Sequence, residues 1–182
     1  VREAYLEKLV AKVAALKVGK PFEPDVAIGP LIDEDGVKKV EDHVARTLEG
    51  GGRLLTGGAR HERGGRFFQP TVLSGGGDTL FTQDETFGPV APVFGFDTED
   101  QALTRANASD FGLAAYLFTR DIDRAMRVGR GLQAGFIGVN TGLVSNAANP
   151  FGGVKQSGYG REGSVYGVED YLQVKSLTLA LG

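Results

Sequence analysis

The segment Glu85–Val90 brings together residue types suited to binding a ligand at the start of an apolar strand. It reads Glu-Thr-Phe-Gly-Pro-Val, so that a carboxylate and an aromatic ring precede a Gly-Pro break. Such a break predicts a loop held rigidly where a strand begins, which is a common position for ligand contacts. Spacing alone leaves an alternative, in which Glu85 is solvated and Phe87 packs in the core.

Other candidate chemistry is weaker. The 182 residues contain no Cys, which excludes a disulfide, a thiolate metal site and a Cys nucleophile within them. His43 and His61 lie far apart without ligand-like spacing, and we expect both at the surface, with no metal bound. Residues 158–163 read G-x-G-x-x-G, but a polar Gly-rich loop precedes them and no acidic residue follows at the required distance. They therefore predict a turn and not a dinucleotide-binding motif.

Composition limits the class of protein. Hydrophobic residues make up 41% and charged residues 24%, which is ordinary for a globular domain. The formal net charge of −3 argues against a nucleic-acid partner, and no apolar run approaches the ~18 residues of a membrane span. Position 1 is Val, and no signal-like segment follows it. Several causes would remove an initiator Met, and truncation of a longer chain, which the motifs described below favour, is one of them.

Apolar periodicity predicts two helices in the first third of the chain. The first carries a stripe at steps of three and four, made of Tyr5, Leu9, Val13 and Leu16 and widened by Leu6 and Val10. Asp33 suits the cap of the second, whose buried face would consist of Val37, Val40, Val44 and Leu48. A short strand is expected over 53–56. Pro70 interrupts the apolar run 67–73, which places that run at a sheet edge or in a loop.

An alternation of strands and helices follows a mobile turn at 74–78. Strands are expected over 90–96, 114–118 and 136–139, the first of them buried on both faces. Thr98 with Gln101 forms a capping box, and Asp121 caps the next helix. This βαβαβ order predicts an α/β fold with a mainly parallel sheet and flanking helices. A short helix near 164–171 and an apolar strand, Val174–Leu181, complete the chain.

The segment Glu85–Pro89 resembles the E-T-F-G-P signature of the NAD(P)-dependent aldehyde dehydrogenases. Further matches to this family follow in the same order along the chain: Tyr5–Leu9, Leu16–Gly19 with Pro21, Ile28–Ile32, Phe68–Val72, Asn107 with Phe111–Ala114, Gly138–Asn140 and Asn149–Gly163. The variants at 140–145 and 154–158 look most like the succinate-semialdehyde dehydrogenase branch. The resemblance spans essentially the whole chain.

Reaction chemistry in this family depends on a Cys thiolate that attacks the aldehyde. The resemblance places that Cys, the general-base Glu, the oxyanion Asn and the dinucleotide-binding domain upstream of Val1. We therefore expect no catalytic residue in this chain and no dehydrogenase activity from it alone. The parent would oxidise an aldehyde, such as succinate semialdehyde, to the acid with NAD or NADP.

Four residues receive roles from the resemblance. Glu85 would accept hydrogen bonds from the nicotinamide ribose hydroxyls, and Phe87 would pack beside the nicotinamide ring. Phe151 would wall the aldehyde channel, and Ser145 would hydrogen-bond the distal carboxylate of the substrate. Plain packing for Phe151 and an idle turn hydroxyl for Ser145 remain alternatives.

The resemblance also implies an organisation. Residues 1–157 would form part of the catalytic domain, and residues 158–182 a helix and an oligomerisation arm. Val174–Leu181 would pair with the sheet of a neighbouring subunit in a cytoplasmic homodimer or homotetramer, since an unpaired apolar strand invites edge pairing. A second hypothesis is a truncated, non-catalytic homologue that acts as an interaction module through the same arm.

Overall fold

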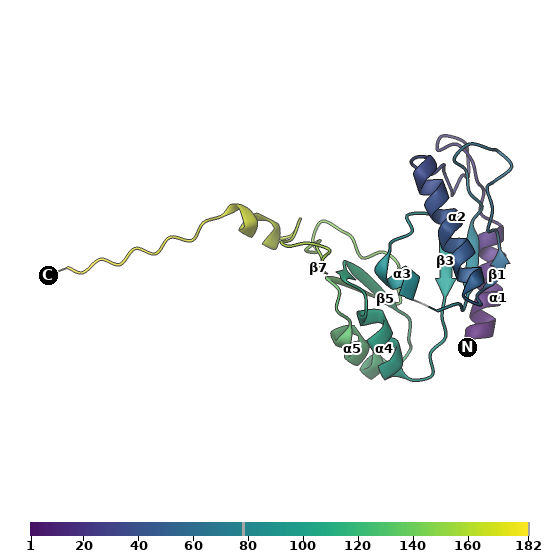
Figure 1. Cartoon of the computed structure of the whole chain (residues 1–182). Coiled ribbons are helices and arrows are strands. Elements are labelled where there is room, and N and C mark those ends of the chain that lie inside the picture. Colours follow the sequence, from purple (N-terminus) through teal and green to yellow (C-terminus); the bar gives the residue numbers. More distant parts are fainter. Residues whose placement is uncertain (78, 182) are drawn as a thin grey trace. The chain divides into compact units, whose positions relative to one another are not determined.

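The first of two compact units, Val1–Phe96, is built on a three-stranded sheet; in this computed structural model, residues 1–77 and 79–181 are described (Figure 1). The elements of this unit are α1 (Arg2–Ala14), α2 (Glu34–Glu49), β1 (Arg53–Thr56), β2 (Thr71–Ser74), α3 (Thr79–Gln83) and β3 (Val90–Val93). The strand order is β1-β2-β3, antiparallel between β1 and β2 and parallel between β2 and β3. The prediction of an edge strand or loop for 67–73 is therefore wrong for residues 71–73, which belong to the central strand, whereas residues 67–70 lie outside the strands.

The strand forms in spite of Pro70, because this residue lies just before β2 and takes no part in the strand ladder. Thr71, directly after it, donates its backbone N–H to Pro89 O at 2.8 Å and pairs in register with Val90. The segment that leads into β3 is thereby attached to the central strand.

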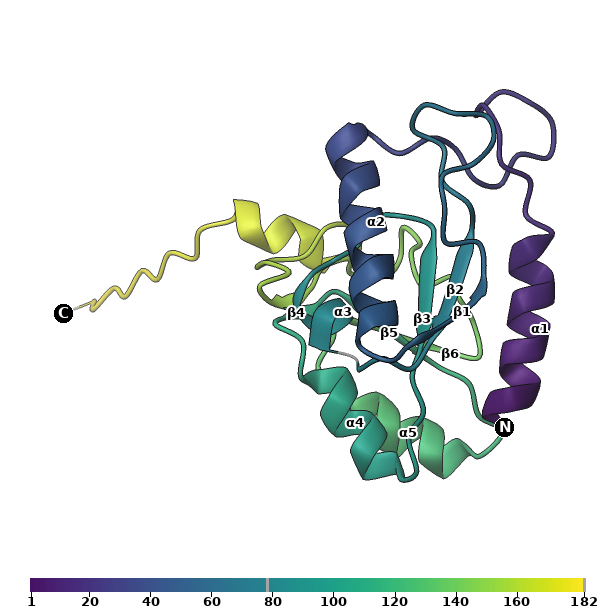
Figure 2. The same ribbon diagram turned by 45° about the vertical axis from the view of Figure 1, so that its right-hand side comes forward.

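Helices lie on either side of this sheet (Figure 2). Val37, Val40 and Val44 of α2 form a core cluster with Phe68 and Leu73. Val72 is also fully buried, as expected of a central strand whose side chains alternate between two covered faces. Asp33 caps α2 as predicted, because its carboxylate accepts the Gly36 N–H at 2.7 Å.

The other predicted faces in this unit fit less well. Helix α1 buries Leu6, whereas Tyr5 and Leu16 of the predicted stripe are exposed. Strand β3 is shorter than 90–96 and only half-buried, not buried on both faces. Gly75, Gly76 and Gly77 adopt positive φ angles, as a glycine turn requires, and Asp78 of the same predicted turn lies outside the described residues.

A parallel βαβ unit organises the second compact unit, Asp97–Gly182. Its elements are α4 (Glu99–Asn107), β4 (Phe111–Gly112), β5 (Ala114–Leu117), α5 (Ile122–Gly131), β6 (Phe136–Val139), β7 (Val154–Lys155) and a 3₁₀ helix, η1 (Tyr166–Tyr171). Strands β5 and β6 pair in parallel with α5 as their crossover, and β4 pairs antiparallel with β7. Thr98 and Asp121 cap α4 and α5 as predicted.

The mixed α/β class is confirmed, but the expected single, mainly parallel sheet is not. Its parallel pairs belong to separate sheets, β2–β3 in the first unit and β5–β6 in the second. The strand expected at Val174–Leu181 is also absent: within the described part of the chain no strand pairs with these residues (Figure 1). A strand exists through backbone pairing with a neighbour, and apolar composition alone does not supply one. Over residues 1–77 and 79–181, the helices are too short or too polar to cross a bilayer.

Candidate functional site

In the segment 84–89, between α3 and β3, residues that contact α2 alternate with exposed residues. Glu85 is exposed, and Phe87 keeps 77% of its surface exposed at a φ of 47°. A positive φ is unusual for a bulky residue and costs of order 1–3 kcal/mol, so surrounding contacts must hold it. The core alternative for Phe87 is therefore wrong, and the ring is available to a ligand.

Those contacts come from the intervening residues, which face α2. The Thr86 hydroxyl lies 3.0 Å from His43 Nδ1. Gly88 packs directly against the side chain of Val40, with no room for a Cβ. Since Val40 and His43 are three residues apart on one helix face, α2 supports the segment on both sides of Phe87.

His43 is fully buried, which corrects the expectation of a surface histidine. Its ring meets Phe81 edge-on, with centroids 5.7 Å apart, and its Nε2 lies 3.2 Å from Asp84 Oδ2. Helical periodicity carried a signal for this burial, because His43 follows Val40 by three residues and so lies on the apolar stripe of α2. The pairing of the ring with residues 84 and 86 had no signal in the sequence.

Asp84 carries a charge partner on the same helix. Lys39 Nζ lies 2.6 Å from Asp84 Oδ1, and this contact, followed by that with His43, holds the pKa of the Asp84 carboxyl below its ordinary value. The carboxylate is ionised at neutral pH, and in that form it only accepts hydrogen bonds.

Glu85 differs from its neighbour Asp84 in having no partner. Among residues 1–77 and 79–181, no hydrogen bond or ion pair involves its carboxylate. A free carboxylate can accept two hydroxyl hydrogen bonds at once, and the exposed Phe87 ring offers a flat apolar face beside it. The segment therefore exposes a carboxylate and an aromatic ring two residues apart.

Ser145 lies in the loop that follows β6 and is exposed. Asparagine side chains shape this loop: Asn146 Oδ1 accepts from the backbone N–H groups of Ala148 and Asn149 at 2.9 and 3.2 Å, and Asn149 Nδ2 donates to Val144 O. Such Asx turns fix the backbone beside Ser145 while its hydroxyl faces solvent.

Phe151 lies at the end of the same loop, and only part of its ring packs against other residues. Its ring lies 4.9 Å from that of Phe136, between centroids, and its backbone exchanges two hydrogen bonds with Glu162. It nevertheless remains 37% exposed. The packing alternative therefore accounts for one part of the ring, and another part stays open to a ligand.

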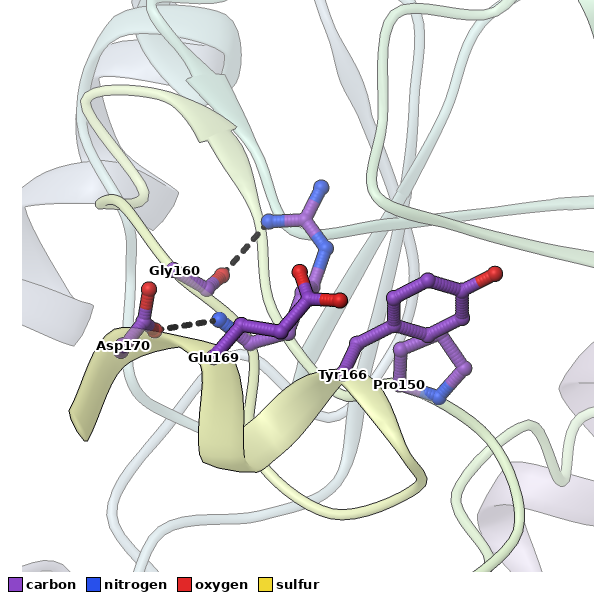
Figure 3. A pocket seen from close by; sticks show the side chains of 6 residues that line it. Pro150, Gly160, Tyr166, Glu169 and Asp170 are labelled. Carbon is purple, nitrogen blue, oxygen red and sulfur yellow. Dashed lines mark hydrogen bonds between the residues drawn. The ribbon is translucent and has the colours of Figure 1, made fainter. Parts of the chain in front are cut away.

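Figure 3 shows a shallow cavity of about 400 Å³ close to this loop, with Pro150, Tyr166 and Asp170 among its lining. Arg161, also in the lining, donates through Nη1 to Gly153 O and Gly160 O, and its backbone N–H reaches Asp170. These are internal bonds of a turn. With Gly158, Gly160 and Gly163 all at positive φ, residues 158–163 form the predicted turn.

The predicted residues fall into two pairs along the chain. Glu85 and Phe87 share one segment of the first unit, and Ser145 and Phe151 share one loop of the second. His43, Asp84 and Thr86 are additions that the sequence did not predict. In the described part of the chain, no group of three or more His, Asp or Glu side chains is arranged to hold a metal ion.

The chain belongs to the Aldehyde dehydrogenase family, whose sequence pattern matches residues 1–177. It is 50% identical over its full length to "Succinate-semialdehyde dehydrogenase [NADP(+)] GabD" of Escherichia coli, and 50% identical over 98% of its length to "3-sulfolactaldehyde dehydrogenase" of Pseudomonas putida. A crystal structure of succinate-semialdehyde dehydrogenase from Burkholderia pseudomallei matches 94% of the chain with a TM-score of 0.91 and 53% identity. The chain spans 38%, 37% and 36% of the lengths of these proteins, respectively.

Proposed function

We propose that this chain supplies the cofactor-facing and substrate-facing segments of an NAD(P)-dependent aldehyde dehydrogenase. The observation that carries the proposal is the pair Glu85 and Phe87, both exposed and two positions apart on a supported segment, with the Glu85 carboxylate unpartnered among the described residues. Family membership supports it, since the pair lies in the E-T-F-G-P signature. NAD or NADP, when bound, would accept the hydride from the aldehyde carbon.

Each residue of the pair has a distinct task in this proposal. Glu85 accepts hydrogen bonds from the two nicotinamide ribose hydroxyls and so orients the sugar. Phe87 limits the swing of the nicotinamide ring, which keeps the hydride acceptor near the reacting carbon. Neither residue donates or removes a proton.

Succinate semialdehyde is the substrate that we propose. The two relatives described above are named for succinate semialdehyde and 3-sulfolactaldehyde, and both compounds carry an anionic group at the end opposite the aldehyde. Ser145 would donate its hydroxyl hydrogen bond to that group, and the open part of the Phe151 ring would line the path of the carbon chain.

The chemical step requires a thiolate that these 182 residues do not contain. In the reaction proposed, the thiolate adds to the aldehyde carbonyl, hydride passes to NAD(P)+, and water hydrolyses the resulting thioester to the acid and the free thiol. The nucleophile and the cofactor domain would belong to the rest of a full-length enzyme. The chain alone is therefore expected to give no NAD(P)H from aldehyde.

The remaining parts of the proposal concern organisation. Residues 1–157 would belong to the catalytic domain of a cytoplasmic enzyme, and residues 158–182 would form its terminal helix and arm. Val174, Leu177, Leu179 and Leu181 are 74–102% exposed, which supports pairing of this arm with another subunit in a homodimer or homotetramer.

Kinetics of the full-length enzyme test the assignment. Glu85→Gln and Phe87→Ala should each raise the KM for NAD(P)+ by about tenfold, as expected for loss of a charge-assisted hydrogen bond or a ring contact. Ser145→Ala should raise the KM for succinate semialdehyde more than that for butanal, which lacks the distal carboxylate. Unchanged cofactor KM values in both position-85 and position-87 variants would overturn the proposal.

A second candidate function is a non-catalytic interaction module. The same exposed apolar arm favours it, together with the absence of Cys from the sequence. Co-expression with a full-length aldehyde dehydrogenase subunit distinguishes the two: a mixed oligomer that is lost when Leu177 and Leu179 become Ser supports the module. Failure of the two chains to copurify excludes it.

A further inference from the structure

We propose that His43 is a positioning residue for the segment 84–89. Through the Thr86 hydroxyl, its imidazole determines where Glu85 and Phe87 project. This inference rests on the proposed function of Glu85 and Phe87 as cofactor contacts, and it adds a residue that lies outside the signature and touches neither cofactor nor substrate.

Both ring nitrogens of His43 are used on the segment that it supports. Nδ1 lies 3.0 Å from Thr86 Oγ1, and Nε2 lies 3.2 Å from Asp84 Oδ2. The ring is fully buried and meets the edge of Phe81, so it has no room to adopt another rotamer without disturbing the packing around it. A buried ring of this kind is a fixed reference point for an exposed loop.

The direction of each hydrogen bond follows from the charge on Asp84. Because Lys39 lies 2.6 Å from its Oδ1, Asp84 is a carboxylate and accepts from His43 Nε2–H. In the neutral imidazole the proton is therefore on Nε2, and Nδ1 is an acceptor. The Thr86 hydroxyl must then donate to Nδ1, which fixes the hydroxyl as well as the ring.

The contact of His43 with Thr86 also determines the positions of the side chains on either side of Thr86. Asp84, Thr86 and Gly88 contact α2, whereas Glu85 and Phe87, which alternate with them, are exposed. Loss of the bond at Thr86 would free the segment between two remaining attachments. Phe87, held at a φ of 47°, would then relax toward ordinary backbone geometry and carry its ring away from the position set by α2.

Substitution of Thr86 tests the inference without emptying the core. In the full-length enzyme, Thr86→Val keeps the shape but removes the donor, and it should raise the KM for NAD(P)+ about fivefold, the effect of one hydrogen bond. Thr86→Ser keeps the hydroxyl and should stay within twofold of wild type. The KM for the aldehyde and the midpoint of thermal unfolding should change little in either variant, which separates positioning from general stability.

His43 itself is tested by spectroscopy, because His43→Ala can fail to fold. In protein labelled with ¹⁵N at histidine, two-bond proton–nitrogen correlations should show His43 as the Nε2–H tautomer, with a hydrogen-bonded Nδ1 that shifts in Thr86→Val. In the 182-residue chain, His61→Gln removes the other histidine and so assigns the signals. In the full-length enzyme the same substitution should leave the cofactor KM unchanged.

The two proposals fail in different ways. An Nδ1–H tautomer, or a Thr86→Val enzyme with the cofactor KM of wild type, would overturn the role of His43. A wild-type enzyme without dehydrogenase activity would overturn the proposed function, while the tautomer measurement would still test the His43–Thr86 bond.

Discussion

Gly88 packs against Val40 of α2 so closely that a side chain on the glycine would overlap the Cγ2 methyl group of the valine. The Leu31 side chain lies 3.6 Å from the same position, which leaves no path by which a methyl group could turn aside. The glycine of the E-T-F-G-P signature is therefore explained by the helix behind it, and not by its own backbone angles.

Gly88→Ala should destabilise the chain by about 1–3 kcal/mol, the range for overpacking a well-filled site. Urea unfolding followed by circular dichroism measures the difference. Gly142→Ala is the matched control, because nothing lies within 4 Å of a Cβ there, and it should stay within about 0.5 kcal/mol of wild type. Equal stability of the two variants would show that the contact with Val40 does not limit the segment.

Backbone strain at Phe87 gives a prediction that separates the effect of the ring from the effect of the backbone conformation. Phe87→Ala and Phe87→Gly both remove the exposed ring, but only glycine adopts a φ of 47° without steric cost. The glycine variant should be more stable than the alanine variant by about 0.5–1 kcal/mol, as measured by urea unfolding. In the full-length enzyme both should raise the cofactor KM, because both lack the ring. An alanine variant as stable as the glycine variant would contradict the strain.

An ion-pair cluster between the helices of the second unit should make its stability fall at acidic pH. Arg127, and after it Arg124, hydrogen-bonds Glu99 and lowers the pKa of that carboxyl from 4.5 to about 2. A lowered pKa favours the ionised, folded form, so the contribution is complete above the unfolded pKa and is lost as the pH falls from about 4.5 to about 2. Urea unfolding between pH 5 and pH 2 should therefore show a shallower decline for Glu99→Gln.

Asp100→Asn is the control for this titration. Asp100 lies in the same first turn of α4, so it shares the helix dipole but not the two arginine contacts. Its substitution should leave the slope of stability against pH close to that of wild type. A Glu99→Gln variant with the full slope would locate the acid sensitivity elsewhere.

Two glycines of α5 differ in the space around them. A Cβ at Gly129 would meet only Ile137, at an ordinary 3.7 Å, whereas at Gly131 it would lie 3.2 Å from both terminal methyl groups of Leu103. Gly129→Ala should stabilise the chain by about 0.5–1 kcal/mol, because alanine loses less backbone entropy within a helix. Gly131→Ala should gain less than this or lose stability. Thermal unfolding of the two variants compares them directly, and the reverse order would contradict the packing described.

Local signals in the sequence predicted the starts of α2, α4 and α5 and several strands. Asp33, Thr98 and Asp121 each cap a helix, because a capping side chain bonds to backbone only two or three residues away. The parallel pairing of β5 and β6 followed in the same way from a strand, a helix and a strand in sequence. Family resemblance located the segment around Glu85 and Phe87, which the structure shows to be exposed and supported.

Features that depend on distant residues were missed. The central position of β2 depends on its neighbours on both sides, and nothing near Pro70 indicates them. The bond from His43 to Thr86 joins residues 43 positions apart, so no local pattern could predict it. The terminal segment 174–181 is unpaired for a related reason: its apolar residues suit a strand, but a strand needs a partner, and the described residues of this chain supply none. Its pairing with another subunit stays a prediction.

Helix α2 contributes both to the core and to the support of the segment 84–89. Val37, Val40 and Val44 are set into the core, while His43, within the same turns, holds the loop. Any substitution that lets α2 rotate about its axis would displace the His43 imidazole, and the segment 84–89 would move with it. If Glu85 and Phe87 bind the coenzyme as proposed, a core substitution made for heat resistance would also change coenzyme affinity, even though the substituted residue lies behind the loop.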